Sequence, residues 1–298
     1  MTSELADSVP ACPAAPPASL DERAGRLYDL LAGFDSVIVA FSGGVDSAYL
    51  AWAATSVLGR RALCVTADSP SYPDRHRQLA LRVAREFGLR HEIIRTAELA
   101  RPEYRANPVN RCYYCKHELY STLSRLAAQR GFAVIADGSN ADDRGDYRPG
   151  RQAAREFGVR SPLDEADLTK ADIRELSRRA GLPTWDEPAS ACLSSRIPYH
   201  SEVTGEKLRM IERAEELLRA RGFRVCRVRH HEFGPGAGRP GALARLEIGR
   251  DELPRIFRAE VIDEIVRALR AIGYRHVTVD LQGYRMGSLN EGLPLRPV

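Results

Sequence analysis

The sequence predicts an α/β protein: a parallel β-sheet with helices on both faces, followed by a smaller C-terminal α+β domain. Through the first two-thirds of the 298 residues, short apolar runs alternate with helical patterns. Later in the chain, charged amphipathic helices surround segments in which apolar and polar residues alternate. Parallel strands need crossover helices and are apolar throughout, whereas alternation is typical of a sheet with one buried face.

The elements of the larger part are expected in the order strand, helix, strand. The strands are apolar runs bounded by turn-forming residues, at 35–42, 61–67, 91–96 and 132–136. The intervening helices are expected at 46–58, 73–87 and 113–130. Ligands of such sheets bind beyond the carboxyl ends of the strands. Site residues are therefore expected directly after these runs.

The smaller part is expected to have the order αββαβ. Its helices are predicted at 201–221 and 251–272, and its strands at 223–230, 242–248 and 276–282. We place the domain boundary in the stretch RIPYH, which gives three regions. These are a disordered, proline-containing tail (1–19), the α/β domain (20–198) and a C-terminal domain for substrate binding or oligomerisation (199–298).

Composition excludes several classes of protein. The net charge is +4, with 44% hydrophobic and 28% charged residues, which is typical of a soluble globular protein. No run approaches the roughly 18 apolar residues of a membrane span, so no membrane partner is expected. The mild basic excess suits a small anionic ligand better than a nucleic acid. Six cysteines are too few for a disulfide scaffold and indicate a reducing cytoplasm.

The strongest motif is the hexapeptide SGGVDS, which follows the first predicted strand and opens a helix. Gly43 and Gly44 let backbone N–H groups approach an anion at a helix N-terminus. Ser42 and Ser47 add hydroxyl donors, and Asp46 is expected to hold a Mg²⁺ that bridges phosphates. The loop has no lysine, so it is not the common Walker-type loop. The alternative, a glycine-rich turn with a polar cap, is disfavoured by this context.

The hexapeptide resembles the pyrophosphate loop (PP-loop) of the ATP pyrophosphatases, the α-hydrolase-like adenylating enzymes that cleave ATP between its α- and β-phosphates. Further segments are similar to the LarE family, the sulfur-insertion enzymes that build the nickel-pincer nucleotide cofactor of lactate racemase and related enzymes. The similar segments are DGSNADD (137–143), DYRPGR (146–151), SPL (161–163), GLPTW (181–185), PASACLSSRIP (188–198) and QGYRMGSLN (282–290).

This resemblance implies an ATP- and Mg²⁺-dependent sulfurtransferase that acts on pyridinium-3,5-biscarboxylic acid mononucleotide. Each carboxylate would be adenylated, with release of pyrophosphate, and then converted to a thiocarboxylate with release of AMP. We expect this small molecule as the partner, no nucleic acid, a homo-oligomer, a sulfide source and a downstream nickel-insertion enzyme. Competing functions are tRNA thiolation, ATP-dependent amide synthesis, and nucleotide sensing without turnover.

Cys192 matches the sulfur-donating cysteine of the family, and Arg196 is expected to stabilise its thiolate. In a sacrificial reaction, the Cβ–S bond of Cys192 breaks and leaves dehydroalanine. Cys112 and Cys115 form a CxxC motif. With Cys192 they match a three-cysteine subgroup, which implies a 4Fe–4S cluster whose open iron carries a sulfide. Zinc and a pair of core cysteines are the alternatives to the cluster, and the sequence leaves both sulfur sources open.

The remaining three cysteines are not assigned to the site. Cys12 falls in the predicted tail and has no role, whereas Cys64 and Cys226 lie in predicted strands and are expected in the core.

Arginines on a predicted strand form a candidate phosphate site. Arg227 and Arg229 lie on one face of that strand, and the resemblance implies that they bind the substrate phosphate. A solvated edge strand is the alternative. Glu247, on the next strand, is expected to face the same site.

Polar residues after the fourth strand are candidates for the ATP site. Asp137 directly follows that strand and is expected to bind ATP. Asp142 is a weaker ATP candidate, and Arg148 and Lys170 are weaker candidates for neutralising the leaving pyrophosphate. Each of these three is equally well explained as a helix cap or a surface ion pair.

Overall fold

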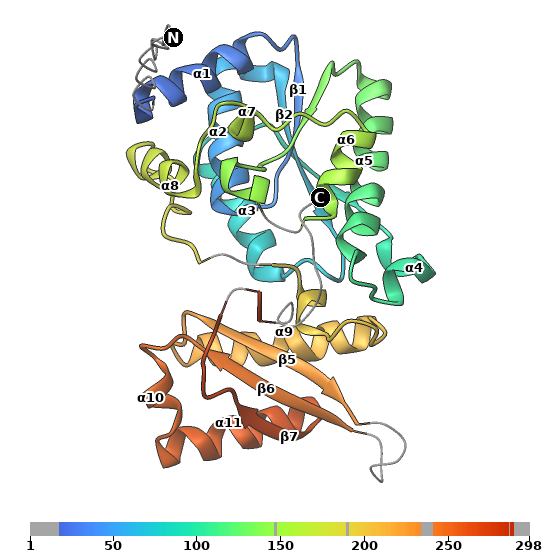
Figure 1. Cartoon of the computed structure of the whole chain (residues 1–298), viewed down its shortest axis with the longest axis vertical. Coiled ribbons are helices and arrows are strands. Elements are labelled where there is room, and N and C mark those ends of the chain that lie inside the picture. Colours follow the sequence, from blue (N-terminus) through green and yellow to red (C-terminus); the bar gives the residue numbers. More distant parts are fainter. Residues whose placement is uncertain (1–17, 146–147, 189–190, 234–240, 286, 289–298) are drawn as a thin grey trace, which may run out of the picture.

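The computed structural model describes residues 18–145, 148–188, 191–233, 241–285 and 287–288. Figure 1 shows an α/β body at one end of the molecule and a smaller sheet with its own helices at the other. This arrangement confirms the predicted fold class. Residues 1–17 of the predicted tail, and Cys12 with them, lie outside the described residues.

The larger sheet is parallel throughout. Its strands are β1 (Val37–Ala40), β2 (Ala62–Asp68), β3 (His91–Arg95) and β4 (Val134–Ala136). The order is β3-β2-β1-β4, and Val37 of the central strand β1 is in register with Ala62 and Val134. The carboxyl ends of all four strands therefore lie at one edge of the sheet.

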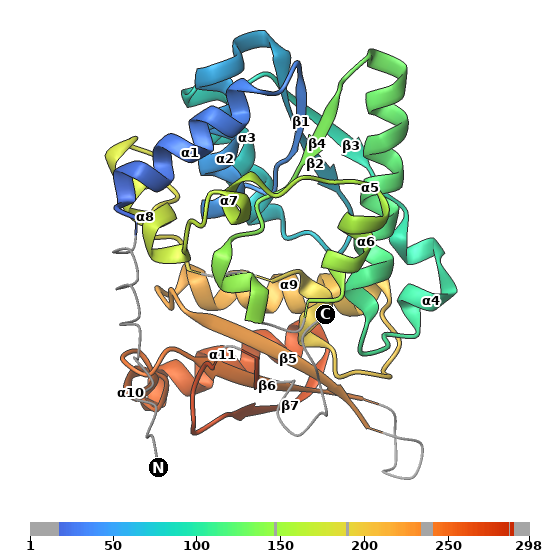
Figure 2. The ribbon, with the colours of Figure 1, turned by 45° about the horizontal axis from the view of Figure 1, so that its top comes forward.

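Helices cover both faces of this sheet. The helices of this part are α1 (Leu20–Ala32), α2 (Val45–Leu58), α3 (Asp74–Glu86), α4 (Pro102–Arg105), α5 (Arg111–Arg130), α6 (Gly150–Glu156), α7 (Pro162–Glu165) and α8 (Lys170–Arg179), of which all but α4 pack on the sheet. Val37 and Val39 pack in one core with α1, α2, α3, α7 and α8, whereas Ile38 packs on the other face with α5 and α6. Figure 2 shows the sheet between these two layers. Alternate side chains of a strand point to opposite faces, which explains this division.

The smaller unit has one sheet and a helical layer. Its elements are α9 (Gly205–Ala220), β5 (Cys226–Glu232), β6 (Ala242–Ile248), α10 (Leu253–Ile256), α11 (Ala259–Ile272) and β7 (Tyr274–Val279). The strand order is β5-β6-β7, with β5 antiparallel and β7 parallel to β6. The predicted helix 251–272 is divided into two, because Arg258 has an extended backbone between α10 and α11.

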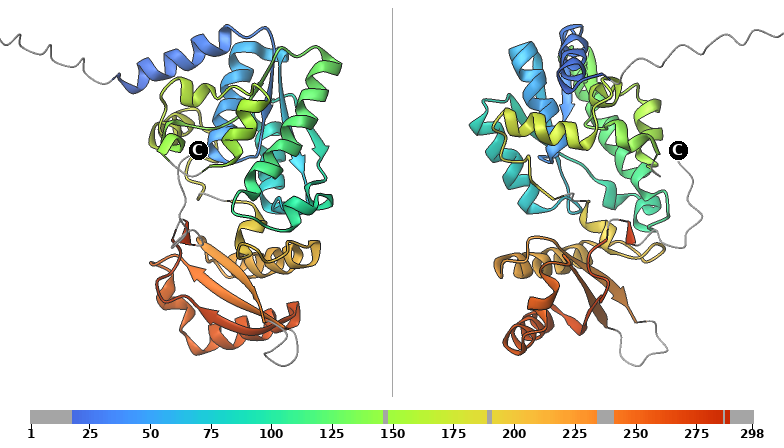
Figure 3. Two further views of the ribbon diagram at one scale, coloured as in Figure 1. Left: turned by 45° about the vertical axis from the view of Figure 1, so that its right-hand side comes forward. Right: turned by 60° about the vertical axis from the view of Figure 1, so that its left-hand side comes forward.

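A short chain segment and α9 connect the two parts. This segment contains the 3₁₀ turn η4 (Leu193–Arg196) and the predicted boundary RIPYH. Leu193, Ile197 and Leu208 pack with Tyr104 of α4 in a separate small core. Figure 3 shows the smaller unit beneath the α/β body in two further views. Among the described residues, no helix is both long and apolar enough to span a membrane.

Candidate active site

The loop between β1 and α2 has the shape expected of an anion-binding loop. Gly43 has a φ of +69°, and a Cβ there would lie 3.0 Å from the Cβ of Ala80, so glycine is required. Gly44 is the N-cap of α2. The Ser47 hydroxyl accepts a hydrogen bond from the Ser42 amide at 3.1 Å and donates one to the Gly44 carbonyl at 3.1 Å. The serines thus fix the loop around a helix N-terminus.

Asp46 lies on the first turn of α2. One oxygen of its carboxylate has a hydrogen-bond partner among the described atoms, and the other has none. Its Oδ2 accepts a short hydrogen bond from the Lys170 ammonium, whereas the buried Oδ1 has no hydrogen-bond partner among the described atoms. Asp143 lies nearby: burial raises the pKa of its carboxyl, Arg148 opposes this, and the charge of Asp46 adds to the rise. Arg148 pairs with Asp143 at 2.8 Å. A divalent cation would satisfy the free oxygen of Asp46.

Asp137 follows β4 and is buried, and its carboxylate accepts several hydrogen bonds. Tyr120 donates to Oδ2 at 2.7 Å, Ser161 donates to Oδ1 at 2.8 Å, and the Ser139 amide donates to Oδ1 at 3.1 Å. A Cβ on the next residue, Gly138, would lie 3.0 Å from the Ser47 nitrogen. This geometry places Asp137 next to the phosphate loop and gives it a role in shaping that loop. Its direct contact with ATP stays a prediction.

Asp142 is the remaining acidic candidate, and it caps a helix. Its carboxylate accepts a hydrogen bond from the Lys170 amide at 2.9 Å, at the first residue of α8.

The three candidate cysteines influence one another. Cys112 and Cys115 lie on the first turns of α5, and Cys192 precedes η4. Desolvation raises the pKa of both thiols of α5, and the negative charge of a Cys192 thiolate raises them further. Cys112 is exposed and the other two are partly buried. The three sulfurs therefore share one electrostatic environment.

This environment is not a ready-made site for a single ion. In the described parts of the chain, no group of three or more His, Cys, Asp or Glu side chains is arranged to hold a metal ion. Zinc and a 4Fe–4S cluster both need ligands gathered around the metal, so the choice between them stays a prediction. Cys64 and Cys226 lie in the two hydrophobic cores, as predicted.

Arg196 has different partners from the one expected. It is completely buried and pairs with Glu215 of α9 through Nε at 2.8 Å and Nη2 at 3.0 Å. Its Nη1 donates to the Cys192 carbonyl at 2.9 Å and to the Ala191 carbonyl at 2.7 Å. All three nitrogens are used by these partners. Burial disfavours the charged guanidinium, but the charge of Glu215 and, after it, that of a Cys192 thiolate raise the pKa of Arg196. The expected role of Arg196 at the Cys192 thiolate thus stays a prediction.

Sequence reasoning missed Arg111, which directly precedes the CxxC motif. It is buried, and its Nη1 donates to the Ser194 carbonyl at 3.0 Å. Burial disfavours the charged form of Arg111, but thiolate charges at Cys192 and Cys112 more than offset this effect and raise its pKa. The position of Arg111 next to the CxxC motif could have indicated a functional role. Arginine is so frequent in this chain that this position alone did not distinguish it.

Arg227 and Arg229 are buried, so the solvated-edge alternative is wrong. Arg229 pairs with Glu247 at 2.8 Å and donates to the Ser195 carbonyl at 2.7 Å, which brings β5 and β6 close to η4. The Arg227 guanidinium lies 5.0 Å from the ring centroid of Tyr284. Burial lowers the pKa of Arg227, and the charge of Arg196 lowers it further. The structure thus places the two arginines near the segment that carries Cys192.

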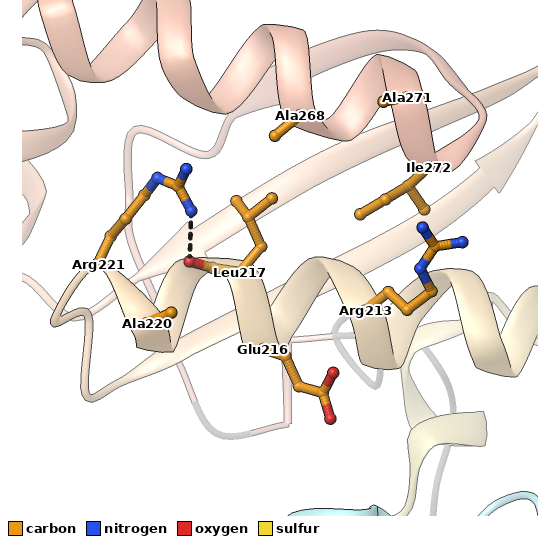
Figure 4. Close-up of a pocket in the computed structure, with 8 residues that line it drawn as sticks. All are labelled: Arg213, Glu216, Leu217, Ala220, Arg221, Ala268, Ala271 and Ile272. Carbon is orange, nitrogen blue, oxygen red and sulfur yellow. Dashed lines mark hydrogen bonds between the residues drawn. The ribbon is translucent and has the colours of Figure 1, made fainter.

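A cavity of about 460 Å³ lies elsewhere, between α9 and α11 (Figure 4). Apolar atoms of Leu217, Ala268 and Ile272 line it, with Arg213 and Glu216 at its edge. It contains none of the residues described above, so it is not part of the candidate active site.

Comparisons with known proteins match both the loop and the whole chain. The NAD synthase family model matches residues 28–106. An uncharacterized protein from Synechocystis is 42% identical, over 92% of this chain and 99% of the relative. The pyridinium-3,5-bisthiocarboxylic acid mononucleotide synthase of Lactiplantibacillus plantarum is 35% identical, over 93% of this chain and 96% of the relative. The tRNA-specific 2-thiouridylase MnmA of Desulforudis audaxviator is 30% identical over only 56% of each chain.

Proposed function

The chain belongs to the LarE family of pyridinium-3,5-bisthiocarboxylic acid mononucleotide synthases, and from this premise we propose that it is an ATP-dependent sulfurtransferase. It converts the carboxylates of pyridinium-3,5-biscarboxylic acid mononucleotide to thiocarboxylates. The observation that carries the proposal is 35% identity over nearly the full length of both chains. The phosphate loop and Cys192 of this sequence are consistent with it. The 2-thiouridylase matches just over half of this chain, so tRNA thiolation is less well supported.

The loop between β1 and α2 supports the activation step. A substrate carboxylate oxygen attacks the α-phosphorus of ATP, the bond to the β-phosphate oxygen breaks, and pyrophosphate leaves. Backbone N–H groups at the start of α2 and the hydroxyls of Ser42 and Ser47 would bind the phosphates. Lys170, which neutralises Asp46 in the structure, is close enough to this loop to neutralise the leaving pyrophosphate instead.

Asp46 is the residue that fits a Mg²⁺ ion. Its buried, unpartnered Oδ1 offers the hard oxygen ligand that this cation prefers. When bound, Mg²⁺ would neutralise negative charge on the phosphates.

Cys192 supports the sulfur-transfer step. Its thiolate attacks the carbonyl carbon of the acyl adenylate, AMP leaves, and a thioester forms. If Cys192 is the sulfur source, removal of its Cα proton breaks the Cβ–S bond. The sulfur then stays on the substrate as a thiocarboxylate, and dehydroalanine remains in the protein.

The donor set of Cys112, Cys115 and Cys192 fits a 4Fe–4S cluster with one iron that lacks a protein ligand. Such a cluster prefers thiolate ligands. It is also wider than a single metal ion, for which the described residues offer no arranged group of ligands. When bound, it would supply a sulfide to the activated carboxylate and leave Cys192 intact. An external sulfide source would then be needed for turnover.

The proposed phosphate site consists of Arg227 and Arg229. Both guanidinium groups are buried. The planar fork of a guanidinium matches the oxygens of a phosphate monoester and can bind them through paired hydrogen bonds. We include in the proposal a homo-oligomeric assembly and a downstream enzyme that inserts nickel into the product.

The test uses anaerobically purified protein with ATP, Mg²⁺ and the dicarboxylate mononucleotide. Pyrophosphate release, product mass and protein mass are measured together. We expect pyrophosphate release and a thiocarboxylate product. A protein mass loss of about 34 Da per sulfur would identify Cys192 as the source, because elimination removes the elements of H₂S. Multiple turnovers without mass loss would identify the cluster.

Two variants locate the sulfur chemistry. C192A is expected to lose product formation and keep pyrophosphate release, because the thiol acts after adenylation. C226A is the matched control, since it removes a thiol in the core of the smaller unit, and we expect it to form product. If the wild-type protein forms neither pyrophosphate nor product, the proposed function is wrong.

A further inference from the structure

We propose that Arg111 is a positioning residue: it holds the turn of Cys192 against the CxxC helix and provides a buried positive charge between the segments of Cys112 and Cys192. The inference rests on the proposed function, because it concerns the sulfur-transfer half of that reaction. It is carried by the hydrogen bonds of Arg111, by the set of contacts around Asn107, and by the absence of a carboxylate among the described partners of Arg111.

The first observation is that Arg111 connects the two segments that carry the thiols. It is the first residue of α5, directly before Cys112. Its Nη1 donates to the Ser194 carbonyl at 3.0 Å, two residues after Cys192. Because Arg111 is itself part of α5, this hydrogen bond joins the segment of the CxxC motif to the segment of Cys192.

The second observation is that Asn107 extends this connection. Nη1 of Arg111 donates a short hydrogen bond to the Asn107 Oδ1, and Asn107 is completely buried. The Asn107 Nδ2 donates to three carbonyls after η4, at 2.7 to 3.3 Å; they belong to Ile197, Pro198 and Ser201. Asn107 has a φ of +53°, a conformation that asparagine tolerates better than most residues. Asn107 and Arg111 thus form a clasp around residues 194–201.

The third observation concerns charge. Among the described ion pairs, Arg111 has no carboxylate partner, whereas the neighbouring Arg196 is neutralised by Glu215 at 2.8 Å. The other described contacts of Arg111 are a carbonyl, an amide oxygen and the ring of Tyr199. A buried guanidinium without a countercharge is costly. A negatively charged group held between the segments of Cys112 and Cys192 would supply the missing charge.

The tests use two substitutions that separate charge from geometry. R111Q removes the charge and keeps a side chain that can hydrogen-bond to the Ser194 carbonyl. R111K keeps the charge and loses the planar fork. R105M is the matched control, because Arg105 lies six residues earlier and its side chain forms an exposed ion pair with Glu202 at 3.5 Å.

One measurement is independent of activity. Each protein, with reduced thiols, is treated with a bifunctional reagent that becomes fluorescent on bridging two thiols, and the bridged peptides are identified by mass spectrometry. We expect bridges from Cys192 to the CxxC motif to form more slowly in both Arg111 variants than in R105M. The bridge from Cys112 to Cys115 is the internal reference, because both thiols are on α5 and do not depend on the clasp.

The second measurement compares two half-reactions. We expect pyrophosphate release by R111Q to stay within about twofold of wild type, while thiocarboxylate formation falls about 10- to 100-fold, as is typical for residues that orient reactive ligands. R111K should recover part of the transfer rate because it restores the charge.

Two results would overturn the inference: sulfur transfer and Cys192 bridging at wild-type rates in R111Q, or a parallel loss of both half-reactions together with unfolding in both variants. If the wild-type protein does not adenylate the substrate, the proposed function fails. The bridging experiment then still decides whether Arg111 positions Cys192.

Discussion

At the scale of single residues, the state of Asp46 in the structure suggests how the ATP site is kept stable without its ligands. The Lys170 ammonium neutralises one carboxylate oxygen, and the other is buried without a partner among the described atoms. An unsatisfied buried acceptor costs about 1–3 kcal/mol, and ligand binding can recover this energy. Lys170 therefore reduces the cost of maintaining a preformed phosphate and cation site.

We predict that D46N loses adenylation. The amide keeps the size of the side chain but removes the charge that would bind Mg²⁺, so pyrophosphate release should fall about 100-fold or more, as is typical of a lost electrostatic contact to the reacting phosphates. The rate is measured with the full substrate set. D35N is the control, because Asp35 is exposed and precedes β1 at the opposite end of the sheet. Pyrophosphate release by D46N at the wild-type rate would contradict the cation role.

The site residues show what a sequence can predict at this scale. The phosphate loop was predictable because all its groups lie within six consecutive residues. The partner of Arg196 was not, because Glu215 is 19 residues away and approaches only when α9 packs against η4. Arg111 was missed for the same reason: its hydrogen-bond acceptor, the Ser194 carbonyl, is 83 residues away.

At the scale of elements, close contact between β4 and α2 shapes the ATP site. A Cβ at Gly138 would lie 3.0 Å from the Ser47 nitrogen and 3.2 Å from its Cα. These are rigid backbone atoms, so an added methyl group could be accommodated only by separating the end of β4 from the phosphate loop. The preceding residue, Asp137, fixes this end of β4 through its hydrogen bonds to Tyr120 and Ser161.

We predict that G138A raises the KM for ATP and lowers the free energy of unfolding by about 1–3 kcal/mol, the usual cost of overpacking. Steady-state kinetics and urea unfolding measure the two effects. G145A is the matched control, since a Cβ at Gly145 meets no described atom within 4 Å. An unchanged KM and stability in G138A would show that the loop and β4 can separate without cost.

Element prediction succeeded where a pattern is local. The predicted strand at 242–248 coincides with β6. The four apolar runs became the parallel sheet, with β1, β3 and β4 shorter than predicted and β2 shifted by one residue. Helix α1 was not predicted, although Ser19 and Glu22 form a capping box at its start. The tail was expected to extend through residue 19, and the proline-containing stretch just before α1 obscured this helix start.

At the scale of the whole molecule, buried charged groups join the two parts. The Arg196–Glu215 pair links η4 to α9, and the Asp74 amide donates to Glu212 of α9, which links α3 to the smaller unit. His76 of α3 lies in this junction. Burial lowers its pKa to about 4, and the charges of Arg75, Arg219, Arg196 and Arg227 contribute further. These arginines come from α3, α9, η4 and β5, so the junction gathers positive charge from both parts.

This arrangement predicts that acid weakens the junction. Above pH 6.5, the imidazole of His76 is neutral in both the folded and the unfolded protein. As the pH falls from about 6.5 to 4, the unfolded chain binds a proton that the folded protein excludes, so stability decreases. The separation of the two pKa values corresponds to about 3 kcal/mol for this one group. His230, whose pKa burial also lowers to about 4, adds a contribution of the same sign from the smaller sheet.

We therefore predict that H76F flattens the acid dependence of stability. Phenylalanine keeps a ring next to Tyr72 and cannot be protonated, so the loss of unfolding free energy between pH 7.5 and 4.5 should be smaller than in the wild type by about 2–3 kcal/mol. Urea unfolding at several pH values measures this difference, and the value at pH 7.5 serves as the reference because the histidine is neutral there. H76F combined with H230F should flatten the curve further, since the two histidines lie on different elements, α3 and β5. If the unfolding free energies of wild type and H76F fall in parallel as the pH decreases, this prediction is wrong. His76 would then be protonated in the folded protein, and the arginines of the junction would not exclude its charge.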